Sequence, residues 1–466
     1  MRQLLREDQV VAGAAARRVY DSDAYGVDRF PPAVVVLPES TAEVASVVRW
    51  CHQQQVPFTP RGAGTGLSGG VMPALGGVVI SIKRLDRILA VEPENRLMHA
   101  QAGCVNLALT RAAHAHGLHF APDPSSQSVA TLGGNIGMNS GGPHTLKYGV
   151  TAPHIRQVTM VDPTGEVLTI GTLAPGSPGP HFLSVVIGSE GTLGVITEAW
   201  VNLTPNPAGY ETALASFRTV RDATQSVADI IALGVTPAAL EFIDRKILEA
   251  LKAAFGLESP SDAEAVLLVE CDGDPGPIHE EMRQIREVLA RNGAIQVETA
   301  ANPAERQRLW TARKKAYGAM GRLAPTVVTH DGVIPRSKLP EMLDFVYRVA
   351  EEHGVGVANM FHAGDGNLHP VFYFDDREPG MIDRVVRAGE AIIRQCVALG
   401  GSVTGEHGVG IEKVDLLALM FNESDRQMMA DVKQIFGDTT LCNPCKVLPS
   451  QKGCLEHMRR WRGAAW

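Results

Sequence analysis

Apolar residues in the first part of the chain fall in short runs that predict strands. Residues 33–37 form one such run, and residues 78–82 form another. Between the two runs, Ser40 or Thr41 precedes a stretch of helical periodicity at residues 43–55, which predicts a helix with a hydroxyl cap. The pattern therefore predicts strands and helices in alternation.

A hairpin and a further strand are predicted before the pattern changes. Residues 155–161 and 167–170 lie on either side of an Asp-Pro-Thr-Gly turn, which predicts a β-hairpin. Residues 195–203 predict another strand, and Pro205 and Pro207 mark a domain boundary behind it.

Beyond residue 207, strands alternate with longer amphipathic helices. Residues 265–270 predict one of these strands. The alternation predicts an α+β sheet that is covered by helices. Helices are predicted at residues 221–233, 278–291, 304–320, 339–353 and 383–399.

Glycine is concentrated in segments where regular structure is not expected. Residues 131–149 are so rich in glycine and asparagine that we expect neither a regular helix nor a regular strand there. Residues 62–70 hold five glycines in nine positions. Glycines let backbone N–H groups converge on an anion, so this loop is a candidate nest for a pyrophosphate, with a long tight turn as the alternative.

The first glycine loop also contains a fingerprint that its context excludes. The segment from Gly64 to Gly69 matches G-x-G-x-x-G, a dinucleotide motif that must open a helix. Residues 70–77 contain Pro73 and three glycines and cannot form that helix, so a Rossmann domain is excluded. No Lys-Ser or Lys-Thr pair closes the loop, which excludes a P-loop.

Composition narrows the class of protein. A chain of 466 residues with 45% hydrophobic and 20% charged residues is typical of a globular protein of two or three domains. The net charge of -8 provides no electrostatic footprint for nucleic acid, so we expect no nucleic-acid partner. A small anion must therefore be bound by individual Arg or Lys residues.

Several features favour a cytoplasmic setting. The N-terminus lacks the apolar core of a signal peptide, and no apolar run approaches the ~18 residues that span a bilayer. The seven cysteines show no framework spacing, which favours a reduced compartment. Peripheral association with the inner membrane through a partner stays open.

Two loops near the C-terminus carry residue types that bind metals. The first contains His362 and His369, and the second contains Glu406 and His407. Two His and one Glu with an open position form a common catalytic metal site, and Zn, Mn and Fe are all compatible with it. The alternative is that these histidines cap turns or hydrogen-bond within a core.

The last cysteines are a further candidate for metal binding. Cys442 and Cys445 form a C-x-x-C pair, and Cys454 follows them. Such a pair indicates an iron–sulfur cluster only weakly, because a cluster needs a fourth ligand. We therefore interpret these cysteines as incidental thiols.

Taken in order, the glycine-rich segments resemble the FAD-linked oxidase family of the vanillyl-alcohol-oxidase or p-cresol-methylhydroxylase type. Within that family the chain is similar to the FAD-binding subunit of glycolate oxidase and to D-lactate and D-2-hydroxyglutarate dehydrogenases. The likeness extends over about residues 28–449. It rests on residues 61–70, 121–126, 133–137, 140–142, 147–149 and 188–197.

The resemblance implies an α+β fold with two main domains. A p-cresol-methylhydroxylase-type FAD-binding domain is expected to precede an α+β FAD-linked oxidase C-terminal domain, which carries the substrate and metal sites. The expected divisions are an N-terminal helical segment at residues 1–29, the FAD-binding domain at 30–207, the C-terminal domain at 208–449 and a tail at 450–466.

The resemblance also implies a bound FAD. Some relatives attach the flavin through a His in the first loop, and residues 60–70 contain none, so a non-covalent FAD is expected. The first loop is expected to hold the pyrophosphate, the segment from Gly133 to lie near the isoalloxazine, and Glu190 with its neighbours to lie near the adenine or ribose. The residues expected at the flavin are Pro60, Arg61, Gly62, Ala63, Gly64, Thr65, Gly66, Leu67, Ser68, Gly69, Pro122, Asp123, Gly133, Gly134, Asn135, Gly137, Ser140, Gly141, Lys147, Tyr148, Gly149, Glu190, Gly191, Gly194, Ile196 and Asn443.

In the 2-hydroxy acid members of the family, His362, His369 and Glu406 match the metal ligands and His407 matches the catalytic base. Oxidation of a hydroxy acid removes the hydroxyl proton and a hydride from Cα. A metal on the hydroxyl oxygen acts as a Lewis acid, and a His base can take the proton near neutral pH. The hydride passes to N5 of the flavin.

The substrate carboxylate needs a cation, preferably the planar fork of an arginine. Arg313 matches an Arg on the substrate helix of the family and is the first candidate, and Arg336 is a weaker one. Thr329 stands where D-2-hydroxyglutarate enzymes carry a Lys for the second carboxylate. This difference favours a monoacid.

We therefore predict FAD-dependent oxidation of a small D-2-hydroxy acid, glycolate or D-lactate, to the 2-oxo acid. The alternatives are a D-2-hydroxyglutarate dehydrogenase, an NADPH-dependent flavin reductase of the same FAD-binding type, and a flavin-binding subunit without catalysis. The last two do not account for the His/His/Glu set and the adjacent His base. Expected partners are iron–sulfur and second flavin subunits, or a quinone or cytochrome as electron acceptor.

Overall fold

The structure is a computed structural model that describes residues 1–448 except 175, 177–178, 257–259 and 261. The expected tail at 450–466 and Cys454 lie outside the described residues. Within the described part of the chain, none of the helices combines the length and the apolar character that crossing a membrane requires.

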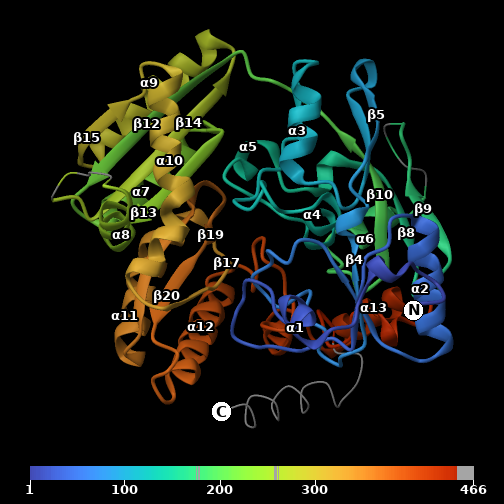
Figure 1. Ribbon diagram of the computed structural model, residues 1–466. Helices are drawn as coiled ribbons and strands as arrows, with labels where there is room; N and C mark the ends of the chain where they lie inside the picture. The colour runs from blue at the N-terminus through green and yellow to red at the C-terminus, as the bar shows by residue number, and fades with distance from the viewer. Residues whose placement is uncertain (175, 177–178, 257–259, 261, 449–466) are drawn as a thin grey trace. The chain divides into compact units, whose positions relative to one another are not determined.

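The chain folds into two compact units (Figure 1). Unit 1 comprises residues 1–141, 150–206 and the chain from 406 onward, and unit 2 comprises residues 142–149 and 207–405. This division differs from the expected domains, because residues 142–149 join unit 2 and the chain returns to unit 1 at Glu406. The return is held by backbone hydrogen bonds within unit 1, from Ile411 N to Ser68 O (2.9 Å) and from Asn443 N to Phe58 O (2.7 Å).

Unit 1 is built on two sheets. The first has the order β1-β2-β4-β3, in which the last three strands are parallel and β1 is an antiparallel edge. The second is antiparallel and has the order β5-β6-β10-β8-β9. The strands are β1 (Val10–Val11), β2 (Val34–Val36), β3 (Phe58–Arg61), β4 (Val78–Ser81), β5 (Ile88–Glu92), β6 (Leu97–Gln101), β8 (Ile155–Val161), β9 (Val167–Gly171) and β10 (Val195–Asn202).

The helix that links β2 to β3 forms where the spacing of apolar residues predicts it. Helix α2 (Thr41–Gln53) begins where the Ser40 hydroxyl accepts a hydrogen bond from the Glu43 N–H at 3.2 Å. Val44, Val47 and Val48 follow at helical spacing and are fully buried in the core of unit 1. The predicted helix is therefore confirmed, as are the predicted hairpin β8–β9 and strand β10.

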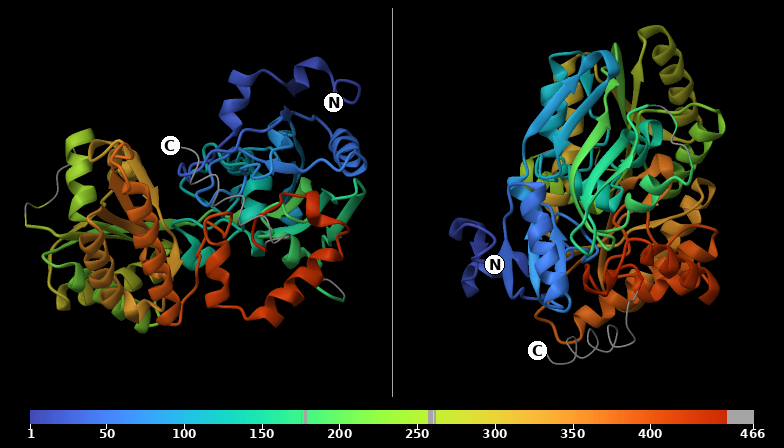
Figure 2. Two further views of the ribbon diagram at one scale, coloured as in Figure 1. Left: turned by 90° about the horizontal axis from the view of Figure 1, so that it is seen from below. Right: turned by 90° about the vertical axis from the view of Figure 1, so that its right-hand side faces the viewer.

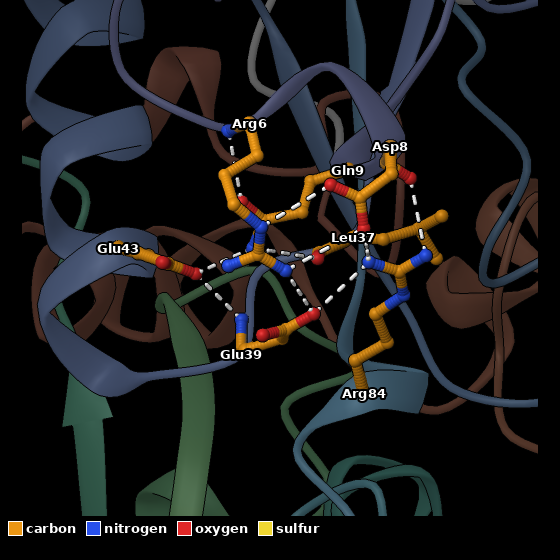
Figure 3. A network of polar contacts seen from close by, with 7 residues as sticks. All are labelled: Arg6, Asp8, Gln9, Leu37, Glu39, Glu43 and Arg84. Atoms are coloured by element: carbon orange, nitrogen blue, oxygen red, sulfur yellow. Dashed lines mark hydrogen bonds and ion pairs between the residues drawn. The ribbon is translucent and has the colours of Figure 1, made fainter.

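The N-terminal segment, expected to be helical, is helical only in part. Its regular helix is limited to α1 (Ala14–Arg17), and the β-branched pair of β1 adds to the edge of β2 instead. Ion pairs fix this edge: Arg6 contacts Glu39 at 2.6 Å, and Arg84 contacts Asp8 at 2.7 Å and Glu39 at 3.0 Å (Figure 3). Long-range pairing therefore decides the conformation of this segment.

The prediction that residues 131–149 contain no regular helix was wrong. Helix α4 (Leu132–Met138) begins at Thr131, whose hydroxyl accepts from the Gly134 N–H at 3.2 Å, and ends at Asn139, which has φ 51°. A short helix, α5 (Thr145–Tyr148), follows. Each helical glycine costs about 1 kcal/mol relative to alanine, but the cap and the burial of Leu132 and Ile136 outweigh this cost.

Unit 2 is built on one large antiparallel sheet. Its order is β15-β12-β14-β13-β18-β19-β17, and β20 pairs with both β18 and β16. The strands are β12 (Gly209–Phe217), β13 (Ala239–Asp244), β14 (Ala265–Gly273), β15 (Ala294–Thr299), β16 (Thr326–Thr329), β17 (Gly332–Val333), β18 (Gly356–His362), β19 (Asn367–Leu368) and β20 (Pro370–Phe374).

Helices pack on this sheet much as the periodicity predicts. Helices α8 (Arg245–Phe255) and α10 (Pro303–Ala319) share buried clusters with strands β13 and β14 and cover one face. Helices α7 (Val220–Ala232) and α9 (Pro275–Arg291) contact β12 and β14. Helices α11 (Leu339–His353) and α12 (Met381–Ala398) lie side by side (Figures 1 and 2). The predicted helices are confirmed, whereas α8 and α13 (Glu423–Gln434) were not predicted.

Two glycines of unit 2 offer a matched test of packing. A Cβ at Gly401 would lie 1.8 Å from Val333 O, so we expect Gly401→Ala to lower the free energy of unfolding by about 3 kcal/mol. A Cβ at Gly318, exposed on α10, meets no atom within 4 Å, so Gly318→Ala should raise it by about 0.5–1 kcal/mol. Denaturant unfolding measures both, and equal effects of the two changes would contradict this packing.

Candidate functional site

A pocket in unit 1 brings together many of the expected flavin residues. They come from the end of β3, from α4 and from the turn before β10. The expected residues that line the pocket are Pro60, Arg61, Gly62, Gly133, Gly134, Gly137, Glu190, Gly191, Gly194 and Ile196. The glycine-rich segments are far apart in sequence, yet they line one pocket.

Other lining residues were missed from the sequence. They are mostly apolar: Gly70, Val71, Ile82, Met138, Met160, Val186, Ser189 and Val195. Gly70, Ser189 and Val195 lie within the glycine-rich segments 61–70 and 188–197 but were not among the expected residues. The other five are apolar residues of a kind that also fills ordinary cores, so no motif distinguishes them. Only the fold shows that they surround one space.

Two glycines allow the backbone segments of the pocket to approach each other. A Cβ on Gly62 would lie 2.4 Å from the Thr131 hydroxyl oxygen. A Cβ on Gly133 would lie 2.8 Å from the side chains of both Ala102 and Ile82. These positions have no room for a side chain, which leaves their backbone exposed to a ligand.

Arg61 places a cation at this pocket. Its side chain is 6% exposed, its guanidinium carbon lies 5.5 Å from the ring centre of Tyr20, and its Nη2 lies 3.5 Å from Val19 O. Burial lowers the pKa of Arg61, and the charge of Asp23 opposes this effect. Its buried Nη1 has no hydrogen-bond partner in the described part of the chain. A buried guanidinium with an open donor fits an anionic ligand such as the pyrophosphate of FAD.

Glu190 lines the pocket and also binds backbone N–H groups of the chain that follows His407. Its two carboxylate oxygens accept from the N–H groups of Val409 and Gly410, each at 2.7 Å. Burial raises the pKa of Glu190, and these two N–H groups act in the opposite direction. The carboxylate of Glu190 therefore holds the segment that follows His407.

The backbone of His407 itself is fixed by the first glycine loop. The Ser68 hydroxyl donates to His407 O at 2.8 Å. Asn443 closes the same region, since its Nδ2 donates to Gly70 O and to Glu190 O, each at 2.8 Å. The chain end thus returns to the glycine loops, and its polar groups organise them.

Sixteen expected flavin residues do not line the pocket. Lys147 and Tyr148 belong to unit 2, where both bond to the Asp272 carboxylate, Tyr148 at 2.6 Å. Burial and Asp272 both raise the pKa of Tyr148. The remaining residues outside the lining are Ala63, Gly64, Thr65, Gly66, Leu67, Ser68, Gly69, Pro122, Asp123, Asn135, Ser140, Gly141, Gly149 and Asn443.

Two of the expected metal ligands meet in unit 2. His362 ends β18 and His369 follows β19, and both side chains are buried. Their ring centres lie 5.1 Å apart, and ring nitrogens of the two lie within 4.8 Å of each other. Asp331, which was missed from the sequence, has a carboxylate oxygen 3.8 Å from His369 Nε2. This paired arrangement fits a divalent cation.

Glu241 on β13 orients His362. Its Oε1 lies 2.7 Å from His362 Nδ1, and its Oε2 accepts from Arg313 Nε at 2.6 Å. Burial acts to raise the pKa of Glu241, but the charges of His362 and Arg313 lower it overall. An ionised carboxylate only accepts hydrogen bonds, so His362 Nδ1 donates to it, and in the neutral imidazole Nε2 then carries the lone pair that a metal requires. The sequence signal for Glu241 was its place among the apolar residues Leu240, Phe242 and Ile243.

Arg313 is oriented by the same carboxylate. It is 6% exposed, and beyond Glu241 its Nη1 lies 3.9 Å from the sulfur of Met360. Lys314 and Lys315 next to it are exposed and form a solvated part of the helix. Arg336 is half-buried.

Glu406 and His407 belong to unit 1 and follow directly on the last residue of unit 2. That residue, Gly405, donates its N–H to both carboxylate oxygens of Asp331, at 3.0 and 2.9 Å. Asp331 also bonds to the Thr404 hydroxyl. The start of the second metal loop is therefore anchored to Asp331 by its backbone.

Cys442 is a buried free thiol. Burial raises its pKa to about 12, and its sulfur lies 3.2 Å from Gly191 O. The incidental role of Cys442 stays a prediction, whereas Cys445 is disulfide-bonded and is not the free thiol that was expected.

Comparison with known proteins identifies the family. The description "FAD linked oxidases, C-terminal domain" matches residues 206–447, and "FAD binding domain" matches residues 32–171. The chain belongs to the FAD-linked oxidases. It is an FAD-dependent oxidoreductase, and the expected family is confirmed.

Relatives of this FAD-linked oxidase cover nearly its whole length. Glycolate oxidase subunit GlcD of Escherichia coli (strain K12) is 41% identical over 94% of this chain and 88% of its own. Glycolate oxidase subunit GlcD of Bacillus subtilis (strain 168) is 37% identical over 93% and 92%. D-lactate dehydrogenase of Anaerostipes hadrus is 34% identical over 91% and 90%.

Solved structures share the fold at low sequence identity. The 4-ethylphenol oxidase from Gulosibacter chungangensis has a TM-score of 0.81 at 18% identity, and the similarity covers 96% of each chain. A p-cresol methylhydroxylase with substrate bound has a TM-score of 0.80 at 17% identity and is matched over 95% of its length, against 96% of this chain. The expected α+β, p-cresol-methylhydroxylase-type fold is confirmed.

The position of Arg61 predicts its role in holding FAD. We expect Arg61→Ala to raise the dissociation constant of FAD at least tenfold, because a buried cation at the pocket is lost. The matched control is Arg84→Ala, which removes an arginine from the N-terminal ion pairs of Figure 3. Flavin fluorescence during titration of the deflavinated protein measures both, and equal affinities of the two variants would exclude this role.

Proposed function

We propose that this FAD-linked oxidase oxidises a small 2-hydroxy monoacid, glycolate or D-lactate, to the 2-oxo acid. One observation carries the proposal: Glu241 joins a candidate metal ligand, His362, to a buried guanidinium, Arg313. A 2-hydroxy acid presents a hydroxyl and a carboxylate on adjacent carbons, so it needs a metal and a cation close together. The names of the relatives agree with this substrate class.

In this proposal His362, His369 and Glu406 hold the metal. The Gly405 N–H donates to Asp331. Glu406 is the next residue, so its Cα lies about 3.8 Å from the Cα of Gly405. A divalent cation supplies Lewis acidity for the substrate hydroxyl when it is bound. The residues fit this role because Glu241 leaves His362 Nε2 as an acceptor and both histidines are buried.

The chain's own residues then divide the remaining work. Arg313 binds the substrate carboxylate through its terminal nitrogens, since its Nε is already bonded to Glu241. His407 takes the hydroxyl proton, while Ser68 binds its carbonyl oxygen and Glu190 binds the N–H of Val409. FAD supplies the two-electron acceptor for the hydride from Cα.

Thr329 supports a monoacid rather than a diacid. It ends β16 with its side chain buried and supplies no charge. A second carboxylate would need a cation in its place, because burying an unpaired charge is costly. D-2-hydroxyglutarate is therefore the less favoured substrate.

We also propose that the chain passes its electrons to other proteins. Two relatives are named as subunits of glycolate oxidase. Iron–sulfur and second flavin subunits, or a quinone or cytochrome acceptor, are the partners proposed here. We further propose a cytoplasmic location, and such a partner could bring the chain to the inner membrane.

Anaerobic reduction of the flavin tests the substrate. We expect glycolate or D-lactate to bleach the flavin absorbance of the purified protein, whereas L-lactate and D-2-hydroxyglutarate should be at least tenfold slower. The measurement needs no knowledge of the electron acceptor. Bleaching by NADPH with no response to any 2-hydroxy acid would instead favour a flavin reductase.

Replacement of the proposed base tests the proton transfer. We expect His407→Ala to slow flavin reduction by about 10²–10⁴-fold and to leave FAD bound, because the imidazole acts on the substrate and only its backbone is held by Ser68. Stopped-flow absorbance gives the rate, and the flavin-to-protein ratio is the control. A rate within tenfold of the parent would remove His407 as the base.

A further inference from the structure

Two buried carboxylates hold α10 on the sheet of unit 2. Glu241 on β13 bonds to Arg313, and Glu270 on β14 accepts from Arg306 Nε and Nη2, each at 2.7 Å. The two arginines are seven residues apart, about two helical turns, so they leave the same face of α10. Both carboxylates are fully buried on neighbouring strands.

The remaining partners of the two carboxylates differ in kind. Glu270 also accepts from Trp310 Nε1 at 2.7 Å and from the Thr212 hydroxyl at 2.5 Å, with His144 Nε2 at 3.4 Å. These groups complete a structural ion pair. Glu241 instead divides its two oxygens between Arg313 and His362.

We propose that Glu241 is a positioning residue that sets two binding groups at once, the metal-binding nitrogen of His362 and the carboxylate-binding nitrogens of Arg313. This inference rests on the proposed function. Because its Oε1 lies 2.7 Å from His362 Nδ1, the Glu241 carboxylate favours the Nδ1–H tautomer of His362, so that Nε2 accepts a cation. By accepting from Nε of Arg313, it leaves the two terminal nitrogens for a carboxylate.

The arrangement makes metal affinity and substrate affinity sensitive to one side chain. A glutamine in place of Glu241 has one accepting oxygen and one donating NH2 group. Since His362 Nδ1 and Arg313 Nε both donate, Glu241→Gln can satisfy only one of them. Partners that orient a metal ligand from behind typically contribute 10–100-fold in metal affinity.

Cobalt binding to the flavin-loaded protein tests the proposal. The protein is stripped of metal with a chelator, and Co²⁺ is titrated in while its visible absorption and the heat of binding are followed. We expect Glu241→Gln to weaken Co²⁺ binding 10–100-fold and to raise KM for the 2-hydroxy acid that bleaches the flavin fastest at least tenfold.

Glu270→Gln is the matched control. It disturbs a buried Glu–Arg pair on the same helix, yet it leaves His362 and Arg313 with their partner. We expect its Co²⁺ affinity and its KM to stay within about twofold of the parent. Equal losses in both variants would assign Glu241 a structural role only and would overturn the proposal.

A second variant keeps the test decisive. Glu241→Asp retains the charge but shortens the side chain by one methylene, so it cannot keep both contacts near 2.7 Å, and we expect it also to weaken Co²⁺ binding at least tenfold. If Glu241→Gln loses its flavin, the result is read from Glu241→Asp. If the Glu241 variant that keeps its flavin binds Co²⁺ as tightly as the parent does, the positioning role is overturned, while the proposed function stays intact. A parent protein that binds no Co²⁺ overturns both.

Discussion

The burial of charge is the constraint on which the functional parts of this protein depend. A carboxylate removed from water is tolerated only when hydrogen bonds or opposite charges replace its hydration. Glu190, Glu241 and Glu270 are all buried, and each is held by at least two donors within its own unit. Because breaking such a set leaves an unpaired charge, each carboxylate fixes the segments that donate to it.

The three carboxylates organise different chemistry. Glu190 accepts from backbone N–H groups and so fixes a loop whose conformation no side-chain packing would define. Glu270 attaches α10 to its sheet. Glu241, on the neighbouring strand, also attaches α10 to the sheet, and it determines which nitrogen of His362 is an acceptor. One type of interaction therefore serves loop geometry, helix packing and ligand orientation.

In the glycine-rich segments, the absence of side chains lets the backbone approach its neighbours closely. Where Gly62 and Gly133 lie, neighbouring atoms occupy the space of a Cβ, so the backbone is as close as it can be to the next segment. A cofactor with a pyrophosphate needs backbone N–H groups within reach, and side chains would prevent this. Arg61 adds the positive charge that a protein of net charge -8 must supply locally.

Local sequence patterns were sufficient for much of this protein. Helical periodicity predicted α2 and five helices of unit 2, because burial of one face every 3.6 residues is a property of the segment itself. The glycine segments and the His and Glu loops pointed to flavin and metal, because those residue types are what such ligands require. The sequence did not predict helix α4 or the strand at the N-terminus, and the family resemblance placed only the chain end, through Asn443, at the flavin and not the return to unit 1 at Glu406. It also missed Glu241, whose partners lie 72 and 121 residues away. Those features arise from contacts between distant segments, and only the tertiary structure decides which donors meet a buried carboxylate.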